Sequence, residues 1–377
     1  MKSDNRLTTL REIMKERGLD TVLVSNFENQ YYFTGLKAIT YSRPILLKVS
    51  QEELSLVIPT LEENHARHMT EADELYVYHE VEGKEGEYSY LEQVDALMDS
   101  IPSGSTVGIE FGALPTKLAF MLKEKRFEVE NIESDIVNMR AIKSREEIDM
   151  IKESGKLVSE ALRLSIENVK VGLSELEMDH FGTEYLFKEV SNTYPNSTLD
   201  YFVMSPSGVD RANMPHVFSN SRKIEDGDII IHSRQVGLNG YRAECERTIF
   251  VGEPTEEQRK AFEVMVEAQA KALDFIKVGV KAKEVNQVAL DVFKKADLEE
   301  YVVHRTGHGI GIGLHEEPSL RFDNELVLEA GMVFCVEPGI YIPGVGGFRH
   351  SDTVVLEENE TVLITDYERD IDGLIIK

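Results

Sequence analysis

The sequence predicts an α+β protein of two domains, a smaller α/β domain at residues 1–142 and a larger α+β domain at residues 143–377. A chain of 377 residues suits two domains that each bury a core. Helix and strand patterns alternate along its first part. The motif Ser144-Arg145-Glu146-Glu147 is a capping box that opens a long amphipathic stretch, so we expect the domain boundary just before it.

The first domain begins with a helix pattern at residues 7–17, which Gly18 ends. Residues 21–24 form an apolar run that is typical of a buried strand. Three further strands are expected in this domain, the first two as a hairpin-like pair: 45–49, 54–58 and 106–109.

The second domain mixes long helix patterns with strand patterns. The helices are expected at 148–169, 173–190, 256–276 and 282–295. The strands are expected at 228–234, 240–250, 332–337, 340–342 and 352–357. The sequence has no repeat at solenoid periods and no low-complexity linker.

The composition is that of an ordinary soluble protein, with 42% hydrophobic and 29% charged residues. The formal net charge of −27 argues against nucleic acid and anionic membranes as partners, because both attract a basic surface. No stretch approaches the roughly 20 apolar residues of a membrane span. Two cysteines, Cys245 and Cys335, make neither a disulfide framework nor a paired zinc motif. We therefore expect a cytoplasmic protein.

Four motifs mark the second domain. They are the segment 227–250, Gly307-His308-Gly309-Ile310-Gly311, Val336-Glu337-Pro338-Gly339 and Gly346-Gly347-Phe348-Arg349. Together they resemble the M24 family, which holds Xaa-Pro dipeptidases, methionine aminopeptidases and creatinase. The resemblance is strong over residues 145–370 and weaker over 1–140, where the segment 31–35 carries it. It implies a pita-bread catalytic domain preceded by a creatinase-type amino-terminal domain.

The resemblance also points to five metal-ligand positions, which dinuclear members fill with Asp, Asp, His, Glu and Glu. In this chain those positions are Ser233, Glu244, His308, Glu337 and Ser351. Serine hydroxyls are poor ligands for zinc or manganese compared with carboxylate and imidazole. We therefore expect no dinuclear centre and no cofactor. The alternative is one divalent cation (Zn, Mn or Fe) among Glu244, His308 and Glu337.

Strand alternation places residues two apart on one face of a sheet. Glu244 and Glu246 should therefore face the same way, as should Cys335 and Glu337. His232 should point to the opposite side and is interpreted as a packed structural histidine. His304 is interpreted as structural and Cys335 as a buried apolar cysteine.

Creatinase, the member that hydrolyses a C–N bond without metal, matches at other positions. The resemblance implies catalytic roles for His216, Glu246 and Glu337. It also implies that Tyr41 and Arg43 of the small domain bind a substrate carboxylate across a dimer. The chain departs from this pattern at Ser351, at Glu244 and around residues 314–321, where a second substrate-binding arginine has no counterpart.

The chemistry of these side chains is coherent. Two carboxylates, Glu246 and Glu337, can accept hydrogen bonds from a cationic or amide-bearing substrate. His216 can activate a water and return the proton to the leaving nitrogen. The remaining substrate-binding candidates are His308, His315 and Glu244. Arg349 is expected to neutralise the carboxylates.

Three functional hypotheses follow. The first is a creatinase-like hydrolase that cleaves a C–N bond of a small carboxylate-bearing guanidino or amide compound without a dinuclear centre. The second is a metal-dependent Xaa-Pro dipeptidase or aminopeptidase P-like peptidase with a mononuclear site. The third is a non-catalytic binding protein, which the retained polar residues disfavour because buried charges are costly. The expected partners are a small-molecule or dipeptide substrate and a second copy of the chain, whose amino-terminal domain would contribute to the neighbour's site.

Overall fold

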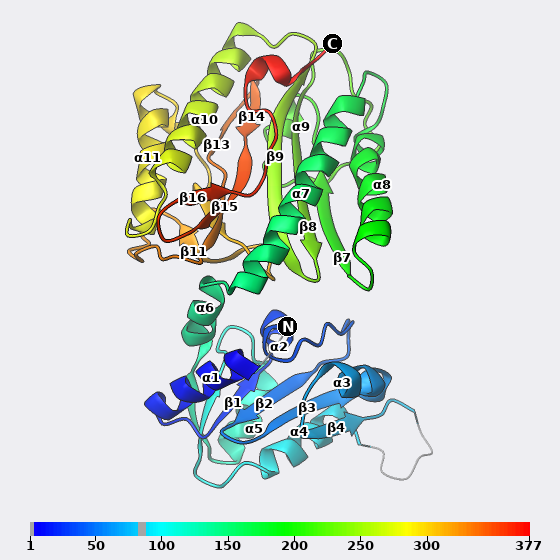
Figure 1. Ribbon diagram of the computed structural model, residues 1–377, viewed down its shortest axis with the longest axis vertical. Coiled ribbons are helices and arrows are strands. Elements are labelled where there is room, and N and C mark those ends of the chain that lie inside the picture. The colour runs from blue at the N-terminus through cyan, green and yellow to red at the C-terminus, as the bar shows by residue number, and fades with distance from the viewer. Residues whose placement is uncertain (1–3, 82–87) are drawn as a thin grey trace. The chain divides into compact units, whose positions relative to one another are not determined.

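The computed structural model describes residues 4–81 and 88–377. The chain divides into two compact units, Met1–Met139 and Arg140–Lys377, which are described separately below. Figure 1 shows both, with helices and strands labelled where there is room.

The first unit is built on a six-stranded sheet with the strand order β4-β3-β2-β1-β5-β6. Its strands are β1 Thr21–Val24, β2 Leu46–Ser50, β3 Leu54–Pro59, β4 Glu74–Tyr78, β5 Thr106–Ile109 and β6 Glu128–Asn131. Its helices are α1 Asp4–Arg17, α2 Phe27–Thr34, α3 Glu63–Met69, α4 Tyr90–Asp99, α5 Thr116–Glu124 and α6 Glu133–Ala141. The expected hairpin-like pair is confirmed, because β2 and β3 pair antiparallel. Apolar side chains of α4 and α5 cover the sheet to form its core.

The second unit contains a nine-stranded sheet. Seven of its strands follow the order β11-β10-β12-β15-β9-β8-β7, while β16 pairs with β15 and β17 pairs with β9. The strands of this path are β7 Leu199–Met204, β8 Ile229–Leu238, β9 Tyr241–Val251, β10 Gly307–Gly309, β11 Glu316–Leu320, β12 Val333–Val336 and β15 Ser351–Leu356. The short strands are β13 Gly339–Ile342, β14 Gly346–Arg349, β16 Thr361–Leu363 and β17 Ile375–Ile376. The helices are α7 Arg145–Asn168, α8 Glu175–Thr193, α9 Val209–Ala212, α10 Glu256–Phe275 and α11 Ala282–Lys295.

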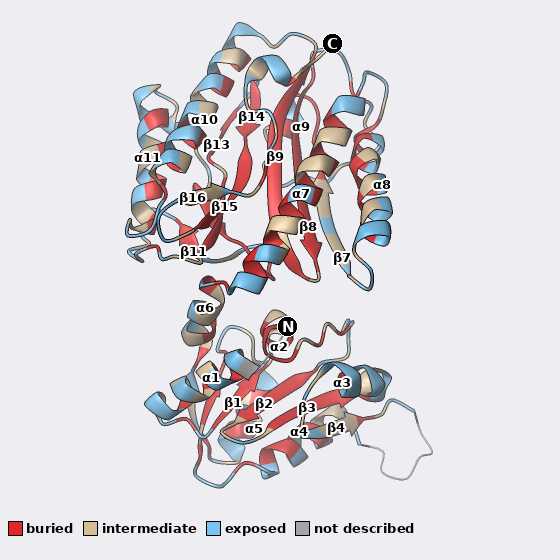
Figure 2. Cartoon of the chain, viewed as in Figure 1, coloured by how far each residue is buried: buried red, intermediate tan, exposed pale blue. Residues whose placement is uncertain are grey.

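Helices cover one face of this sheet. On that face, Arg234 of β8 donates to Ser165 Oγ of α7 at 2.8 Å, and Gln269 of α10 donates to Asp352 of β15 at 3.1 Å. His232 lies on the same face, fully buried beside Ser205 at 2.7 Å, as predicted. Figure 2 shows β8 and β9 buried, the edge strand β7 only partly buried, and helices with exposed outer sides. The alternate residues of β8, such as Ser233, face the other side of the sheet.

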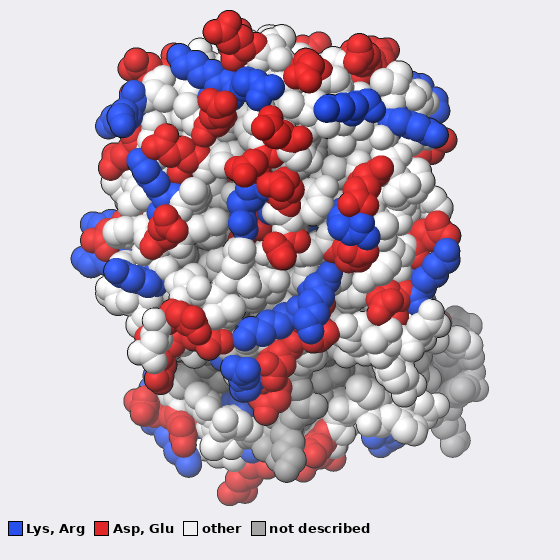
Figure 3. Space-filling model, turned by 45° about the horizontal axis from the view of Figure 1, so that its top comes forward, with Lys and Arg blue, Asp and Glu red and all other residues white. Residues whose placement is uncertain are grey.

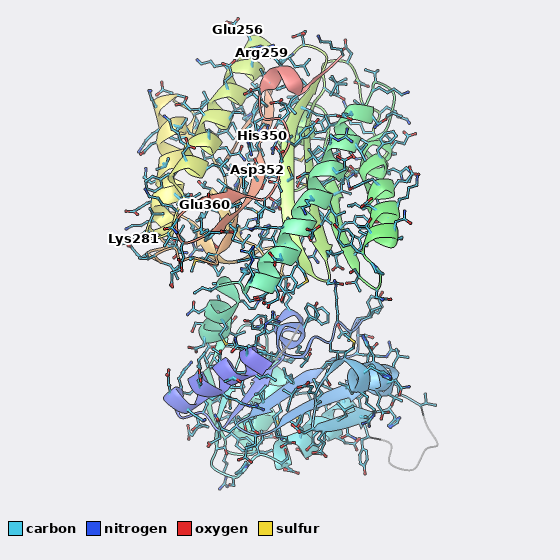
Figure 4. The ribbon with its side chains drawn as sticks, in the orientation of Figure 1. Glu256, Arg259, Lys281, His350, Asp352 and Glu360 are labelled. Atoms are coloured by element: carbon cyan, nitrogen blue, oxygen red, sulfur yellow. The ribbon has the colours of Figure 1, made fainter. Side chains whose placement is uncertain are left out.

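Asp352 holds β15 against its neighbours from this helix-covered side (Figure 4). Its carboxylate accepts from Arg247 of β9 at 3.0 Å, Thr365 at 2.8 Å and Arg369 at 3.0 Å. His350, two residues earlier and also labelled there, packs its ring against Phe262 of α10. Buried charges paired in this way keep the strand in one register, and the register of β15 decides which residues face the site.

A two-residue turn fixes the central hairpin of β8 and β9. Asn239 and Gly240 have φ of 50° and 83°, the left-handed values that a tight hairpin turn needs and that Asn-Gly adopts readily. The turn sets the register that places Ser233 opposite Glu246 and Gln235 opposite Glu244. The strand expected at 228–234 therefore continues to Leu238, because the turn follows there directly.

The long helix expected at 148–169 is present as α7. Ser144 caps it by accepting from the backbone N–H of Glu147, while Glu147 accepts from that of Ser144.

No helix among the described residues combines the length and apolarity that a bilayer span requires. On the face shown in Figure 3, acidic and basic side chains are interspersed.

Candidate active site

The candidate site lies on the sheet face opposite the helices, where the strand register aligns side chains in two rows. The first row runs across β10, β12, β15, β9 and β8 and consists of His308, Cys335, Thr353, Glu244 and Gln235. The second row lies two residues along and consists of Glu337, Ser351, Glu246 and Ser233. All five ligand-type positions named from the sequence are thus brought together.

A glycine permits the close approach of β10 to β12. A Cβ on Gly307 would lie 2.0 Å from the carbonyl oxygen of Cys335, which no side chain tolerates. Pairing at this distance sets His308 directly opposite Cys335. The glycine-rich motif therefore delivers the histidine to the site.

Arg349 neutralises one of the three carboxylates. Its guanidinium binds both oxygens of Glu246, with Nη2 2.8 Å from Oε2, and lies 3.9 Å from Glu337 Oε2. Nη1 donates to the hydroxyl of Tyr341 at 2.8 Å. A bidentate pair of this kind fixes both partners firmly. Glu246 therefore does not reach toward solvent but supports Arg349.

Glu244 and Glu337 carry the remaining acidity. Burial, followed by the nearby charge of Glu337, raises the pKa of Glu244 to about 7. Ser351 Oγ donates to Glu244 Oε1 at 2.6 Å and Gln235 donates to Oε2. Burial also acts to raise the pKa of Glu337, but His308 and Arg349 outweigh it and hold that pKa below its usual range. Of the two carboxyl groups, Glu244 therefore holds a proton more readily than Glu337 near neutral pH.

Four histidines lie around the carboxylates. His308 and His315 stack with ring centroids 3.9 Å apart. Burial, and then the charge of His308, lower the pKa of His315 to about 4, so this ring is neutral. His304 contacts the Tyr341 hydroxyl at 3.0 Å. His216 is exposed on the loop after Pro215, whose carbonyl accepts from Arg349 at 3.3 Å.

A cavity of about 810 Å³ opens at Glu337, the member of the second row that lines it. Its lining residues are Pro215, His216, Asn286, Leu290, Val302, Val303, His304, Arg305, His315, Arg321, Phe322, Glu337 and Arg349. Of the catalytic residues predicted from the sequence, His216 and Glu337 line it, whereas Glu246 is bound to the lining residue Arg349 and is not itself part of the wall. His304, interpreted as structural from the sequence, is part of the wall.

Sequence reasoning missed Arg305. Its Nε is buried and, among the described residues, has no hydrogen-bond partner. No carboxylate in the described part of the chain pairs with it, and its Nη2 lies 3.3 Å from His315 Nδ1. The other two arginines of the wall have carboxylate partners: Arg321 pairs with Asp323 at 2.6 Å, and Arg349 pairs with Glu246. The missing second arginine was sought around residues 314–321, but the wall arginine without a carboxylate partner in the described chain lies directly after His304.

Tyr41 and Arg43 belong to the first unit. Arg43 Nε pairs with Glu80 of that unit at 2.7 Å. The Tyr41 side chain is 90% exposed and its φ is 37°. Their expected contribution to a neighbour's site, and the homodimer it requires, stay predictions.

The donor set does not fit two metal ions. Bridging two cations takes several carboxylates, but Ser233 and Ser351 replace two of them, and Glu246 is bound by Arg349. The hydroxyl of Ser351 donates its hydrogen bond to Glu244. A single cation does fit, because Glu244 and His308 keep acceptor atoms close together in a buried position.

Comparison with known proteins agrees with the motifs. Residues 149–358 match the model of metallopeptidase family M24, and residues 6–142 match the creatinase/prolidase N-terminal domain. The Xaa-Pro dipeptidase of Pyrococcus furiosus is 32% identical over 368 residues, which cover 97% of this chain and 99% of the relative. The prolidase structure from Thermococcus sibiricus superposes with a TM-score of 0.87 at 28% identity, covering all of both chains. The creatinase of Bacillus sp. (strain B-0618) is 28% identical over 384 residues, 99% of this chain and 92% of the relative.

The chain belongs to metallopeptidase family M24 and is a hydrolase with the pita-bread fold. Among the relatives compared, similarity to Xaa-Pro dipeptidases is greater than similarity to creatinase. The comparisons thus favour the dipeptidase hypothesis over the creatinase-like one.

Proposed function

We propose that this protein hydrolyses an amide-type C–N bond in a small substrate that carries a free carboxylate, and that it does so without a two-metal centre. The observation that carries the proposal is the two-row site itself. It keeps Glu244, Glu337 and His308 beside an open cavity, while serines occupy two of the family's five ligand positions. A binding protein would have no need for acidic groups and imidazoles so close together in a buried site.

His216 and Glu337 are the groups placed to touch substrate. Glu337 lines the cavity as a carboxylate and accepts hydrogen bonds from the substrate nitrogen. His216 takes a proton from the attacking water and returns it to the leaving nitrogen. Glu246 acts through Arg349, which it keeps in place beside Glu337. A cation bound at Glu244 and His308 would polarise the scissile carbonyl.

Arg305 supplies the positive charge for the substrate carboxylate. It is the cavity-wall arginine that no carboxylate of the described chain occupies. Arginine binds a carboxylate in a fixed two-bond geometry and so orients the bond to be cleaved. Val302, Val303 and Phe322 add apolar wall beside it, which suits a compact apolar group such as a prolyl ring.

Xaa-Pro dipeptides are the first substrate class under this proposal. They contain an amide to a ring nitrogen and a free carboxylate, and the relatives compared include Xaa-Pro dipeptidases. Creatine-like guanidino acids are the second class. They are favoured by Glu246 directly before Arg247-Thr248 and by the two serines, since creatinase acts without metal.

The test is turnover of both classes by the full chain, with and without a chelator and with added zinc or manganese. Release of proline or of urea above the background of a Glu337→Gln variant supports the proposal. The proposal fails if neither class, nor other small carboxylate-bearing amides, is hydrolysed under any of these conditions.

A further inference from the structure

Three buried ligand atoms converge in the first row of the site. The side chains of Glu244, His308 and Cys335 each offer an atom within 4.8 Å of the other two. His308 and Cys335 are cross-strand partners, so their side chains project from the same face. Thr353 pairs with Cys335 and joins it to Glu244.

His308 offers a ring nitrogen to this group. Its Nδ1 contacts the carbonyl oxygen of Gly309 at 2.9 Å, so Nε2 is the ring nitrogen left for another partner. The side chain is fully buried, yet within the described chain Nε2 has no hydrogen-bond partner. Nε2 lies 3.3 Å from Glu337 Oε1, with which the protonated ring pairs. A bound cation would take the place of that proton, because a metal ligand must be deprotonated.

The other two ligands are already held by outer contacts. Both oxygens of Glu244 accept hydrogen bonds, from Ser351 and Gln235. The Thr353 hydroxyl donates to the carbonyl of Glu244 at 2.8 Å, so in its 3.7 Å contact with Cys335 the thiol is the donor. Contacts of this type orient metal ligands in proteins.

We propose that Glu244, His308 and Cys335 form a mononuclear thiolate site for one zinc-type divalent cation, in place of the carboxylate-rich pair of metals. Thiolate and imidazole select zinc, iron or cobalt over magnesium and calcium. Three protein ligands with one open position are the arrangement of a catalytic zinc site. On binding, the Cys335 S–H bond breaks, its proton passes to solvent, and the sulfur electron pair bonds to the cation without any redox change.

This inference revises the interpretation of two residues. Cys335, taken from the sequence as a buried apolar cysteine, becomes a ligand. Glu337, expected from the sequence as the third ligand, stays with Arg349 at the cavity wall. The inference does not depend on the proposed hydrolysis, because a cation can bind whether or not a substrate is cleaved.

Cobalt titration of the chelator-treated, full-length protein tests the site. We expect one equivalent of Co²⁺ to bind and to give an intense thiolate-to-cobalt charge-transfer band in the near ultraviolet. The Cys335→Ser variant should lose that band, and its dissociation constant should rise by more than the roughly 10–100-fold that loss of an outer-shell group costs. Cys245→Ser is the matched control, because Cys245 is equally buried but lies on the opposite face beside Asp352. It should keep the band.

Two outcomes overturn the proposal. One is no cobalt binding at one equivalent, which would assign His308 to a proton-mediated pair with Glu337. The other is cobalt binding with the same spectrum in Cys335→Ser. X-ray absorption of the unsubstituted, zinc-loaded protein tests the same site without relying on the folding of Cys335→Ser. A sulfur neighbour at about 2.3 Å supports the site, and nitrogen and oxygen neighbours alone contradict it. A protein that shows the band but cleaves nothing would count against the proposed function only.

Discussion

His216 is the residue on which proton transfer depends. It is exposed on a loop at the cavity, so its removal leaves the core intact. We expect His216→Ala to lower kcat by about 10²–10⁴-fold, the usual contribution of a positioned general base. The melting temperature of the His216→Ala variant should stay close to that of the unsubstituted protein. Unchanged kcat in a folded variant would remove His216 from the mechanism.

Arg305 and Arg321 offer a matched pair for testing carboxylate binding. Both line the cavity, but only Arg321 already has a carboxylate partner. Arg305→Gln should raise KM by roughly 10-fold or more with a smaller effect on kcat, since a charged hydrogen bond contributes about 1.5–3 kcal/mol. Arg321→Gln should change KM little. Equal effects of both variants on KM, or a larger effect of Arg43→Gln, would show that Arg305 is not the residue that binds the substrate carboxylate.

At the residue scale, motif spacing predicted which side chains gather at the site. Glu244, Glu246, His308 and Glu337 do lie together, because alternation along paired strands determines which residues share a face. The sequence predicted that Arg349 neutralises the carboxylates, but not that it binds both oxygens of Glu246 in particular. It also could not predict that, in the described chain, no carboxylate pairs with Arg305. Both depend on three-dimensional neighbours that no spacing encodes.

The pairing of β8, β9 and β15 leads to a prediction for a double variant at Ser233 and Ser351. Ser233 and Ser351 lie on either side of Glu246, on β8 and β15. Ser233→Asp combined with Ser351→Glu restores the carboxylates of a dinuclear site. We expect this double variant to bind a second equivalent of manganese or zinc and, when free of metal, to be less stable because like charges repel. A double variant that folds but binds no additional cation would show that the serines do not decide the stoichiometry.

Long elements and short apolar strands such as β1 and β5 were predictable, but the short glycine-rich strands β10 and β14 were not. The helices expected at 256–276 and 282–295 are present as α10 and α11, because capping and 3.6-residue periodicity determine them. The strands β10 and β14 were missed, since three or four residues rich in glycine have no apolar alternation. These two strands carry His308 and Arg349. The site therefore depends on the elements with the weakest local signal.

At the scale of the whole molecule, stability should depend on pH through Glu316. Burial acts to raise the pKa of Glu316, but Lys143 and Arg140 outweigh it and lower that pKa from 4.5 to about 2. A lowered carboxylate pKa stabilises the fold above pH 4.5, and the effect is lost as the pH falls toward 2. The difference corresponds to about 3 kcal/mol. Glu316→Gln should lower the free energy of unfolding by about this amount at pH 7 and by roughly half or less at pH 3, as urea unfolding would measure. An equal loss at both pH values would contradict the ion pair as its cause.

The number of divalent cations that the full-length protein binds distinguishes a one-metal site from a two-metal site. Mass spectrometry of metals in tag-free protein, saturated with zinc or manganese and freed of weakly held ions, gives this number. We expect no more than one equivalent per chain, because Ser233 and Ser351 replace ligands and Arg349 occupies Glu246. Two tightly bound equivalents would contradict this expectation.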